Sequence, residues 1–367
     1  MNEVTLLHDL AIVMIAAGIA AFLAHMFDQS KVLGYILAGI AIGPHTPPFS
    51  FVQSETTIQT LADLGILFLM FSLGLEFHLR RLRAVGRKAL IIAVLDVVLM
   101  LYLGYHVGIW LGWGALESLF LGAVICDSST TVLAKLLRDL HKSQESFAHI
   151  VYATTLVEDL LAIGLIAILT GVISTGSLQA GPVLGRMGVL GIFLVTVIIT
   201  GLLLVPRLLT RVVRYRNDEL LVIVVLALAF GVSLLAVELH LSLALGAFLI
   251  GAITAESGMI GRVEMLVAPL RHMFTAVFFV AIGLLVQPML LVQHAGPIIG
   301  VAAIIIVGKW INCTLGCFLT GGSLGTSFRV GIAMGQVAEF ALIIAALGLA
   351  MHATRPEVYQ VAVGATV

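Results

Sequence analysis

Charged residues are scarce in this chain of 367 residues: they make up 11% of it, whereas hydrophobic residues make up 60%. A soluble globular domain has roughly 25% charged residues, so the shortage excludes that class. The mean hydropathy of +1.15 and repeated apolar runs long enough to cross about 30 Å of hydrocarbon indicate a polytopic membrane protein. These runs do not alternate with polar residues, which excludes an outer-membrane barrel.

Other features that would point to chemistry are also absent. The three cysteines, Cys126, Cys313 and Cys317, lie in apolar runs, so no disulfide framework is expected. Cys313 and Cys317 are four residues apart and share a helix face, where close packing is a simpler interpretation than a metal site. No glycine-rich nucleotide motif and no nucleophile motif is found, so we expect neither a cofactor nor an enzyme. No basic stretch precedes the first apolar segment, which favours a true helix over a signal peptide.

The apolar runs predict an all-α membrane protein with about thirteen transmembrane helices and no soluble domain. The second and ninth spans are short for a helix that must cross the whole hydrocarbon layer. The predicted spans are 6–26, 31–43, 58–77, 88–110, 116–136, 148–172, 187–209, 219–237, 240–254, 266–286, 295–319, 328–350 and 355 to the end.

Lysine and arginine are unevenly divided between the two sides that these spans define. One side holds sixteen of the nineteen basic residues, the other holds only Arg186 and Arg355, and Lys309 lies within a span. Cytoplasmic loops carry an excess of basic residues, so the richer side is predicted to be cytoplasmic. This orientation places the N-terminus outside and the C-terminal end in the cytoplasm.

An odd number of spans allows an inverted repeat. If the seventh span is a linker, the first six and the last six spans form two sets whose equivalent members run in opposite directions. Transporters built in this way place their binding site near the midplane, between discontinuous helices. The sequence therefore predicts two inverted six-helix repeats with discontinuous crossover helices.

Two adjacent acids, Glu158 and Asp159, lie in the middle of the sixth predicted span. A charge near the bilayer centre costs at least ~2.5–3.5 kcal/mol on insertion scales, and adjacent helix residues point about 100° apart. Each acid therefore needs its own cation, proton or donor. Lys309 is the only base deep within a span, and we expect it to pair with Glu158 or Asp159. The alternative is a lysine that extends to the interface.

Two polar segments are candidates for the predicted helix breaks. In the fifth span an acid precedes four hydroxyl residues, and such side chains compete for backbone hydrogen bonds. Either the helix unwinds there to line an ion site, or the hydroxyls bond back to the preceding turn. The twelfth span carries the equivalent segment. The residues concerned are Asp127, Ser128, Ser129, Thr130 and Thr131 in the fifth span, and Gln336 and Glu339 in the twelfth.

Other residues within the spans have simpler interpretations. Asp96, in the fourth span, has either a structural hydrogen bond or a role in the ion path. Glycines at four-residue spacings permit close helix packing. These glycines are Gly39 and Gly43, and Gly104, Gly108 and Gly112.

Six groups of residues, in order along nearly the whole chain, form a recognisable set. They are 34–44, 61–65 with 71–76, 128–130, 244–248, 278–283 and 335–340. Together they resemble the monovalent cation:proton antiporter-2 family, which includes bacterial sodium/proton exchangers and glutathione-gated potassium efflux systems. The resemblance implies a homodimer. Residues 1–87 and 219–290 would form its dimerisation part, residues 88–172 and 291–367 its ion-transport core, and residues 187–216 a linker helix.

The resemblance also implies a secondary monovalent cation/proton antiporter of the bacterial plasma (inner) membrane. Cation and proton would compete for Asp159, and Lys309 matches the core lysine of the family. At the position of Glu158 sodium exchangers tend to carry Asp and potassium efflux systems Gln. This chain carries Glu there, which matches neither. K⁺/H⁺ exchange is our hypothesis, with Na⁺/H⁺ exchange as the alternative. The site would contain Asp127, Glu158, Asp159, Ser128, Ser129 and Thr130, supported by Lys309, Glu339 and Gln336.

A cation channel, with the same acids as a selectivity ring, is the rival hypothesis from another class. One acid pair on a single helix, without a repeated filter loop, argues against it. The expected partners are membrane lipid, K⁺ or Na⁺ and H⁺, and a cytosolic regulatory domain or subunit; no nucleic acid is expected.

Overall fold

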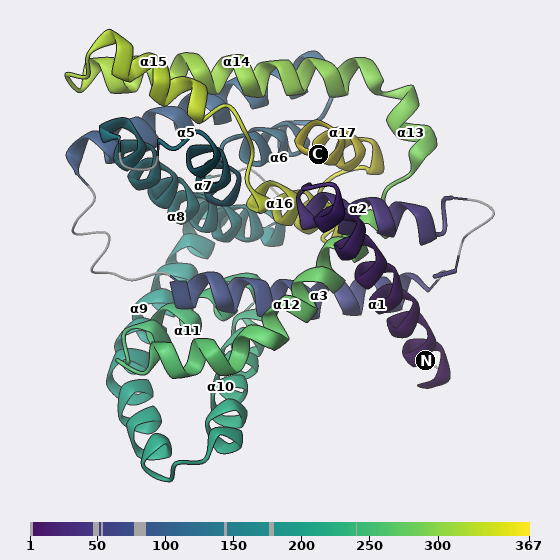
Figure 1. Ribbon diagram of the computed structural model, residues 1–367, viewed down its shortest axis with the longest axis vertical. Coiled ribbons are helices and arrows are strands. Elements are labelled where there is room, and N and C mark those ends of the chain that lie inside the picture. Colours follow the sequence, from purple (N-terminus) through teal and green to yellow (C-terminus); the bar gives the residue numbers. More distant parts are fainter. Residues whose placement is uncertain are drawn as a thin grey trace. The chain divides into compact units, whose positions relative to one another are not determined.

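A computed structural model describes residues 3–46, 51–52, 54–76, 86–142, 145–175, 180–239 and 241–367 (Figure 1). All the regular structure in these residues is helical. The helices are α1 (Glu3–Met26), α2 (Lys31–Ile42), α3 (Glu55–Glu76), α5 (Arg87–Trp110), α6 (Ala115–Ile125), α7 (Thr130–Asp139), α8 (Ser146–Thr175), α9 (Ala180–Arg214), α10 (Asp218–Glu238), α11 (Leu243–Ala255), α12 (Ile260–Leu284), α13 (Pro288–Gln293), α14 (Ala295–Leu319), α15 (Leu324–Ala333), α16 (Glu339–Ala350) and α17 (Pro356–Thr366).

Each predicted span contains a helix, and the two spans expected to be broken are broken. The fifth divides into α6 and α7, and the twelfth into α15 and α16. Among the residues described, eight helices are long and apolar enough to cross a membrane, so the total of thirteen crossings stays a prediction. Helix α9 begins seven residues before the predicted seventh span, and α13 was not predicted.

The chain divides into two compact units. Unit 1 consists of Met1–Leu79 and Ala167–Pro288, and unit 2 consists of Arg80–Ile166 and Met289–Val367. Unit 1 holds α1–α3 and α9–α12; in it α9 and α10 lie side by side, joined by a short turn (Figure 1). Unit 2 holds both broken helices together with α5 and α14. The dimerisation, transport and linker roles assigned from the sequence stay predictions.

Glycine contacts draw the helices of unit 1 together. A Cβ atom on Gly39 of α2 would collide with the Val280 carbonyl of α12 and lie 2.8 Å from the Cα of Gly283. Gly74 of α3 meets Gly251 of α11 in the same way. Helices α2 and α11 are the second members of the two repeats, and α3 and α12 are the third. The two contacts are therefore equivalents, as an inverted repeat requires.

The glycines of α5 divide between two roles. Gly104 lies against Gly122 of α6, and Gly108 lies against Ser118, so close packing is confirmed for these two. The interpretation was wrong for Gly112, which lies beyond the end of α5 with a φ of +80°. That backbone conformation suits glycine because it has no Cβ, so Gly112 serves a turn.

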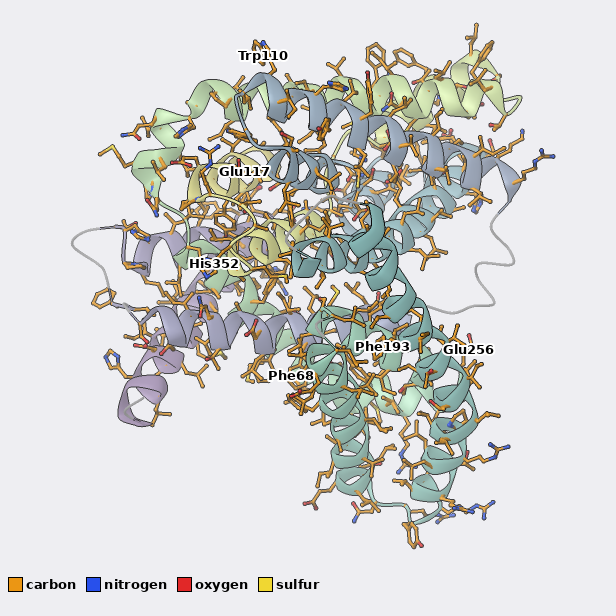
Figure 2. The ribbon with its side chains drawn as sticks, turned by 180° about the vertical axis from the view of Figure 1, so that it is seen from behind. Phe68, Trp110, Glu117, Phe193, Glu256 and His352 are labelled. Atoms are coloured by element: carbon orange, nitrogen blue, oxygen red, sulfur yellow. The ribbon has the colours of Figure 1, made fainter. Side chains whose placement is uncertain are left out.

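Large apolar side chains cover much of the outer surface. Ile192 and Leu204 on α9 are 70% and 64% exposed, and Leu234 on α10 is 60% exposed. A soluble protein rarely shows so wide an apolar surface, whereas lipid covers it at no cost. Trp110, at the end of α5, is 85% exposed (Figure 2), as expected of an aromatic side chain near lipid headgroups.

In unit 2, α14 and α5 pack against each other and run in opposite directions. Gly308 of α14 lies against Met100 of α5, and Gly316 lies against Ile92. Lys309 and Asp96 are therefore placed at similar depths on facing helices. A buried apolar cluster from α5, α7, α8, α14 and α15, which includes Cys313 and Cys317, surrounds one end of this contact. The cysteines lie free and buried, as the packing interpretation predicted.

Candidate functional site

The two helix breaks meet within unit 2. The backbone N–H of Ala338 donates to the carbonyl of Asp127 at 3.4 Å, and the Ser128 hydroxyl donates to the carbonyl of Met334 at 3.4 Å. The backbone N–H of Ser129 donates to Oε1 of Gln336 at 2.5 Å. Each break therefore supplies hydrogen-bond partners for backbone groups that are left free where the other helix is interrupted. We call the place where residues 126–129 meet residues 334–338 the crossing.

The hydroxyl run explains why the first helix breaks where it does. Helix α6 ends at Ile125, and α7 begins at Thr130 with Ser129 as its N-cap, whose hydroxyl accepts from the Val132 N–H at 3.3 Å. Serine is among the preferred N-cap residues. Oδ1 of Asp127 accepts from the N–H of Ser128 at 3.0 Å. These bonds confirm the unwound crossover rather than an unbroken helix.

The helix dipoles give the crossing a charge pattern of its own. Helices α6 and α15 bring their carboxyl ends to it, and α7 and α16 bring their amino ends. A carboxyl end favours a cation and an amino end favours an anion. In agreement with this, the ammonium of Lys309 donates a hydrogen bond to the carbonyl of Cys126 at the carboxyl end of α6. The acid Glu339 is the first residue of α16, at its amino end.

Lys309 is held by three acceptors in the protein interior. Its Nζ donates to Oδ2 of Asp96 at 2.9 Å, to the carbonyl of Cys126 at 2.9 Å and to the hydroxyl of Ser128 at 2.8 Å. Oε2 of Glu158 lies 3.8 Å away. The side chain is fully buried, so the alternative of a lysine that reaches the interface was wrong. The expected pair with Glu158 is present, but Asp96 is the closer partner.

The crossing holds more buried acid than buried base. Asp96, Asp127, Glu158 and Lys309 all have 0% of their surface exposed. Within the described part of the chain, the two carboxylate oxygens of Glu158 have no hydrogen-bond partner, and Oδ2 of Asp127 has none either. Unpaired buried charge is costly, so such a cluster needs protons or a cation to neutralise it. Reversible binding of protons or a monovalent cation is the chemistry that this arrangement supports.

The other predicted site residues lie on the same elements. Asp159 follows Glu158 on α8 and is half-buried; Thr130 and Glu339 are half-buried at the first positions of α7 and α16. Nε2 of Gln336 donates to the carbonyl of Ala333 at 3.2 Å. The structure thus brings Asp127, Ser128, Ser129, Gln336, Glu158 and Lys309 into one cluster, to which Asp159 is adjacent in sequence.

Sequence reasoning left the role of Asp96 open and missed Cys313 as a neighbour of the acids. Ligand atoms of Asp96, Glu158 and Cys313 lie within 4.8 Å of one another, a spacing that could hold a metal ion. The ammonium of Lys309 binds one of these carboxylates directly, and it serves as the cation there. Two features of the sequence could have indicated that Asp96 pairs with Lys309. Each residue lies in the middle of a span, and their helices, α5 and α14, are equivalent members of the two repeats.

Two ion pairs join the outer parts of unit 2 at equivalent places. Glu117, in the first turn of α6, accepts from Nε and Nη2 of Arg355, just before α17, at 2.8 and 3.0 Å (Glu117 is labelled in Figure 2). Glu145, just before α8, accepts from Arg329 of α15 at 2.9 Å and from Lys142 at 3.0 Å. Each pair ties the first half of one broken helix to the start of the last helix of the other repeat.

Comparisons with known proteins agree on one family. The profile described as "Sodium/hydrogen exchanger, transmembrane" matches residues 11–367. The YbaL protein of Escherichia coli K12 is 33% identical over 347 residues, which are 92% of this chain and 62% of YbaL. The chain therefore spans less than two thirds of that relative. The K⁺/H⁺ antiporter subunit KhtU of Bacillus subtilis is 28% identical over 94% of this chain and 86% of its own length.

The fold has a match among solved structures. The sodium proton antiporter MjNhaP1 of Methanocaldococcus jannaschii superposes with a TM-score of 0.77, over 100% of this chain and 94% of its own, at 15% sequence identity. At that identity the match concerns the fold, and it supports the all-helical architecture predicted from the sequence.

Proposed function

Because this chain belongs to the sodium/hydrogen exchanger family, we propose that it exchanges a monovalent cation for a proton across a membrane. The family assignment confirms the resemblance seen in the sequence, and it places the chain among transporters rather than enzymes. The observation that carries the proposal is the crossing of two broken helices around buried acids that outnumber the buried base.

The proposed mechanism is competition for the acids beside the crossing. Asp159 is half-buried on α8, next to the fully buried Glu158. A carboxylate in such a place binds either a proton or a cation that has lost part of its water, and one excludes the other. Alternating exposure of the site to the two sides of the membrane turns this exclusion into exchange. A gradient of one ion then drives the other.

K⁺ is the cation that we propose, with Na⁺ as the alternative. The observation that favours K⁺ is the similarity to KhtU, a K⁺/H⁺ antiporter subunit, over nearly the whole chain. MjNhaP1 is a sodium proton antiporter, but its 15% identity bears on the fold alone. Glu158 matches neither the Asp that sodium exchangers tend to carry at this position nor the Gln of potassium efflux systems.

The assembly and placement follow from the same resemblance. We propose a homodimer in the bacterial plasma membrane, formed through helices of unit 1, with unit 2 as the part that carries the ion and α9 as the linker. The division of basic residues supports an external N-terminus and a cytoplasmic C-terminal end. Lipid covers the exposed apolar surface, and a cytosolic regulatory domain or subunit stays part of the proposal.

Purified protein in proteoliposomes tests the function. A pH gradient is dissipated by added K⁺, Na⁺, Rb⁺ or Li⁺ in turn, at several pH values, and the proton flux is recorded with a trapped dye. An exchanger gives saturable, cation-dependent proton flux and no unitary current in a planar bilayer. Unitary currents without proton coupling would favour the channel alternative, and no cation-dependent flux of any kind would refute exchange.

A further inference from the structure

The ammonium of Lys309 has no hydrogen-bond donor left over. A protonated lysine has three N–H donors, and three acceptors surround Nζ: Asp96, the Cys126 carbonyl and the Ser128 hydroxyl, at 2.8–2.9 Å. Glu158 lies at 3.8 Å, which is beyond hydrogen-bond distance. Lys309 can therefore donate to Glu158 only if it gives up one of the other three acceptors.

We propose that Asp96 is a positioning residue of the ion site: it holds the Lys309 ammonium on the carboxyl end of α6, so that Glu158 stays available to the transported ions. The inference rests on the proposed function, because it assigns Asp96 a part in binding the cation. It gives the two acids near Lys309 different tasks. Asp96 is the fixed counter-ion of the lysine, and Glu158 is a second acid of the site beside Asp159.

The packing of α5 suits Asp96 to this task. Contacts of Gly308 with Met100 and of Gly316 with Ile92 pin α14 against α5 on both sides of the Asp96–Lys309 pair. Asp96 has a short side chain and 0% exposure, so the position of its carboxylate is fixed by the helix. Glu158 comes from α8, has a longer side chain and has no hydrogen-bond partner among the described residues.

Loss of the Asp96 charge would redirect Lys309. A buried ammonium without a counter-ion is costly, and the closest remaining carboxylate among those described is Glu158. In an Asp96→Asn protein, Glu158 would therefore move the short distance needed to pair with the lysine. The transported cation would lose one of its acids, and its apparent affinity would fall.

Transport kinetics separate this role from a merely structural one. We expect Asp96→Asn to raise the KM for K⁺ on the order of tenfold, which corresponds to ~1.4 kcal/mol, with a smaller effect on kcat. Glu158→Gln should raise KM by itself. In the Glu158→Gln background, Asp96→Asn should then raise KM no further, because the carboxylate that Lys309 would capture has already been removed. Asp96→Glu keeps the charge and should recover part of the affinity.

Asp9→Asn is the matched control, because Asp9 is a buried acid of α1, in unit 1, outside the crossing. Its KM should equal that of the wild type. Additive effects of Asp96→Asn and Glu158→Gln on KM, or an unchanged KM in Asp96→Asn, would overturn the proposal.

Thermal unfolding in detergent supplies a test that needs no transport. Double-mutant cycles pair Lys309→Gln with Asp96→Asn and with Glu158→Gln, and coupling is read from the shifts in Tm. The Asp96–Lys309 coupling should be the larger, and a larger Glu158–Lys309 coupling would refute the inference. If the wild type shows no exchange at all, the proposed function fails, while this cycle still decides which acid holds the lysine. If Asp96→Asn does not fold, Asp96→Ser, which also removes the charge, takes its place in the cycle.

Discussion

The side-chain oxygen of Gln336 accepts a hydrogen bond from the backbone N–H of Ser129, 207 residues away in sequence. Ser129 is the N-cap of α7, and Gln336 lies in the gap between α15 and α16. A single amide therefore links the two helix breaks and satisfies a buried donor. The crossing depends on side chains as well as on the path of the backbone.

Removal of this amide should loosen the crossing. Gln336→Leu leaves the N–H of Ser129 without its acceptor, and a buried unsatisfied donor costs about 1–3 kcal/mol. We expect a lower Tm and a reduced rate of cation-dependent proton flux. Gln336→Glu keeps an acceptor oxygen and is the matched control for the hydrogen bond. Wild-type Tm and flux in the Leu variant would show that the bond is dispensable.

The glycine contact between α2 and α12 gives a prediction with a definite sign. Gly39→Ala places a methyl group against the Val280 carbonyl, and forced packing of this kind costs typically 1–3 kcal/mol. Gly18→Ala on α1 is the control, because a Cβ there has nothing within 4 Å. Alanine is a better helix former by roughly 1 kcal/mol. Tm should fall for Gly39→Ala and stay level or rise for Gly18→Ala; the same shift in both would contradict the close contact.

The ion pair of Glu145 should be lost at acid pH. A hydrogen bond from Lys142, followed by the charges of Lys142 and Arg329, lowers the pKa of the Glu145 carboxyl. A lowered pKa in the folded state adds stability above the unfolded pKa of ~4.3, and this stability disappears as the pH falls through the folded value. The Tm difference between wild type and Glu145→Gln should therefore shrink as the pH drops below about 4.3. A Tm difference that grew on acidification would refute the pair.

The orientation can be tested with single cysteines. Cys126, Cys313 and Cys317 are fully buried, so a membrane-impermeant maleimide should give little background on intact cells. A cysteine at Arg211 should react only after the inner face is opened, and a cysteine at His294 should react from outside. External labelling at position 211 would invert the proposed topology.

Much of the fold was readable from local patterns. Span length, hydropathy and the hydroxyl run around Ser128 are properties of short segments, so the helices and the first break could be predicted without knowledge of their neighbours. The second break at Gln336 followed from the expected symmetry. The equivalent contacts of Gly39 with Gly283 and of Gly74 with Gly251 express that same symmetry in three dimensions.

The partner of Lys309 could not be predicted in this way. Asp96 is 213 residues from Lys309, and the choice between Asp96 and Glu158 depends on how closely α5 packs on α14. That distance is set by small residues such as Gly308 and Gly316, whose contacts the sequence does not specify. The same limit applies to the pair of Glu117 with Arg355, since each residue lies at the end of a span and neither has a sequence neighbour that points to the other.

The central claim is that Asp159 carries the ion, and proton flux of Asp159→Asn in proteoliposomes tests it most directly. The control is Asp63→Asn, the same substitution at an exposed acid of α3 in unit 1, with equal reconstitution and Tm verified for both. We expect no cation-dependent proton flux from Asp159→Asn and wild-type flux from Asp63→Asn. Saturable flux at the wild-type rate from folded Asp159→Asn protein would contradict the account.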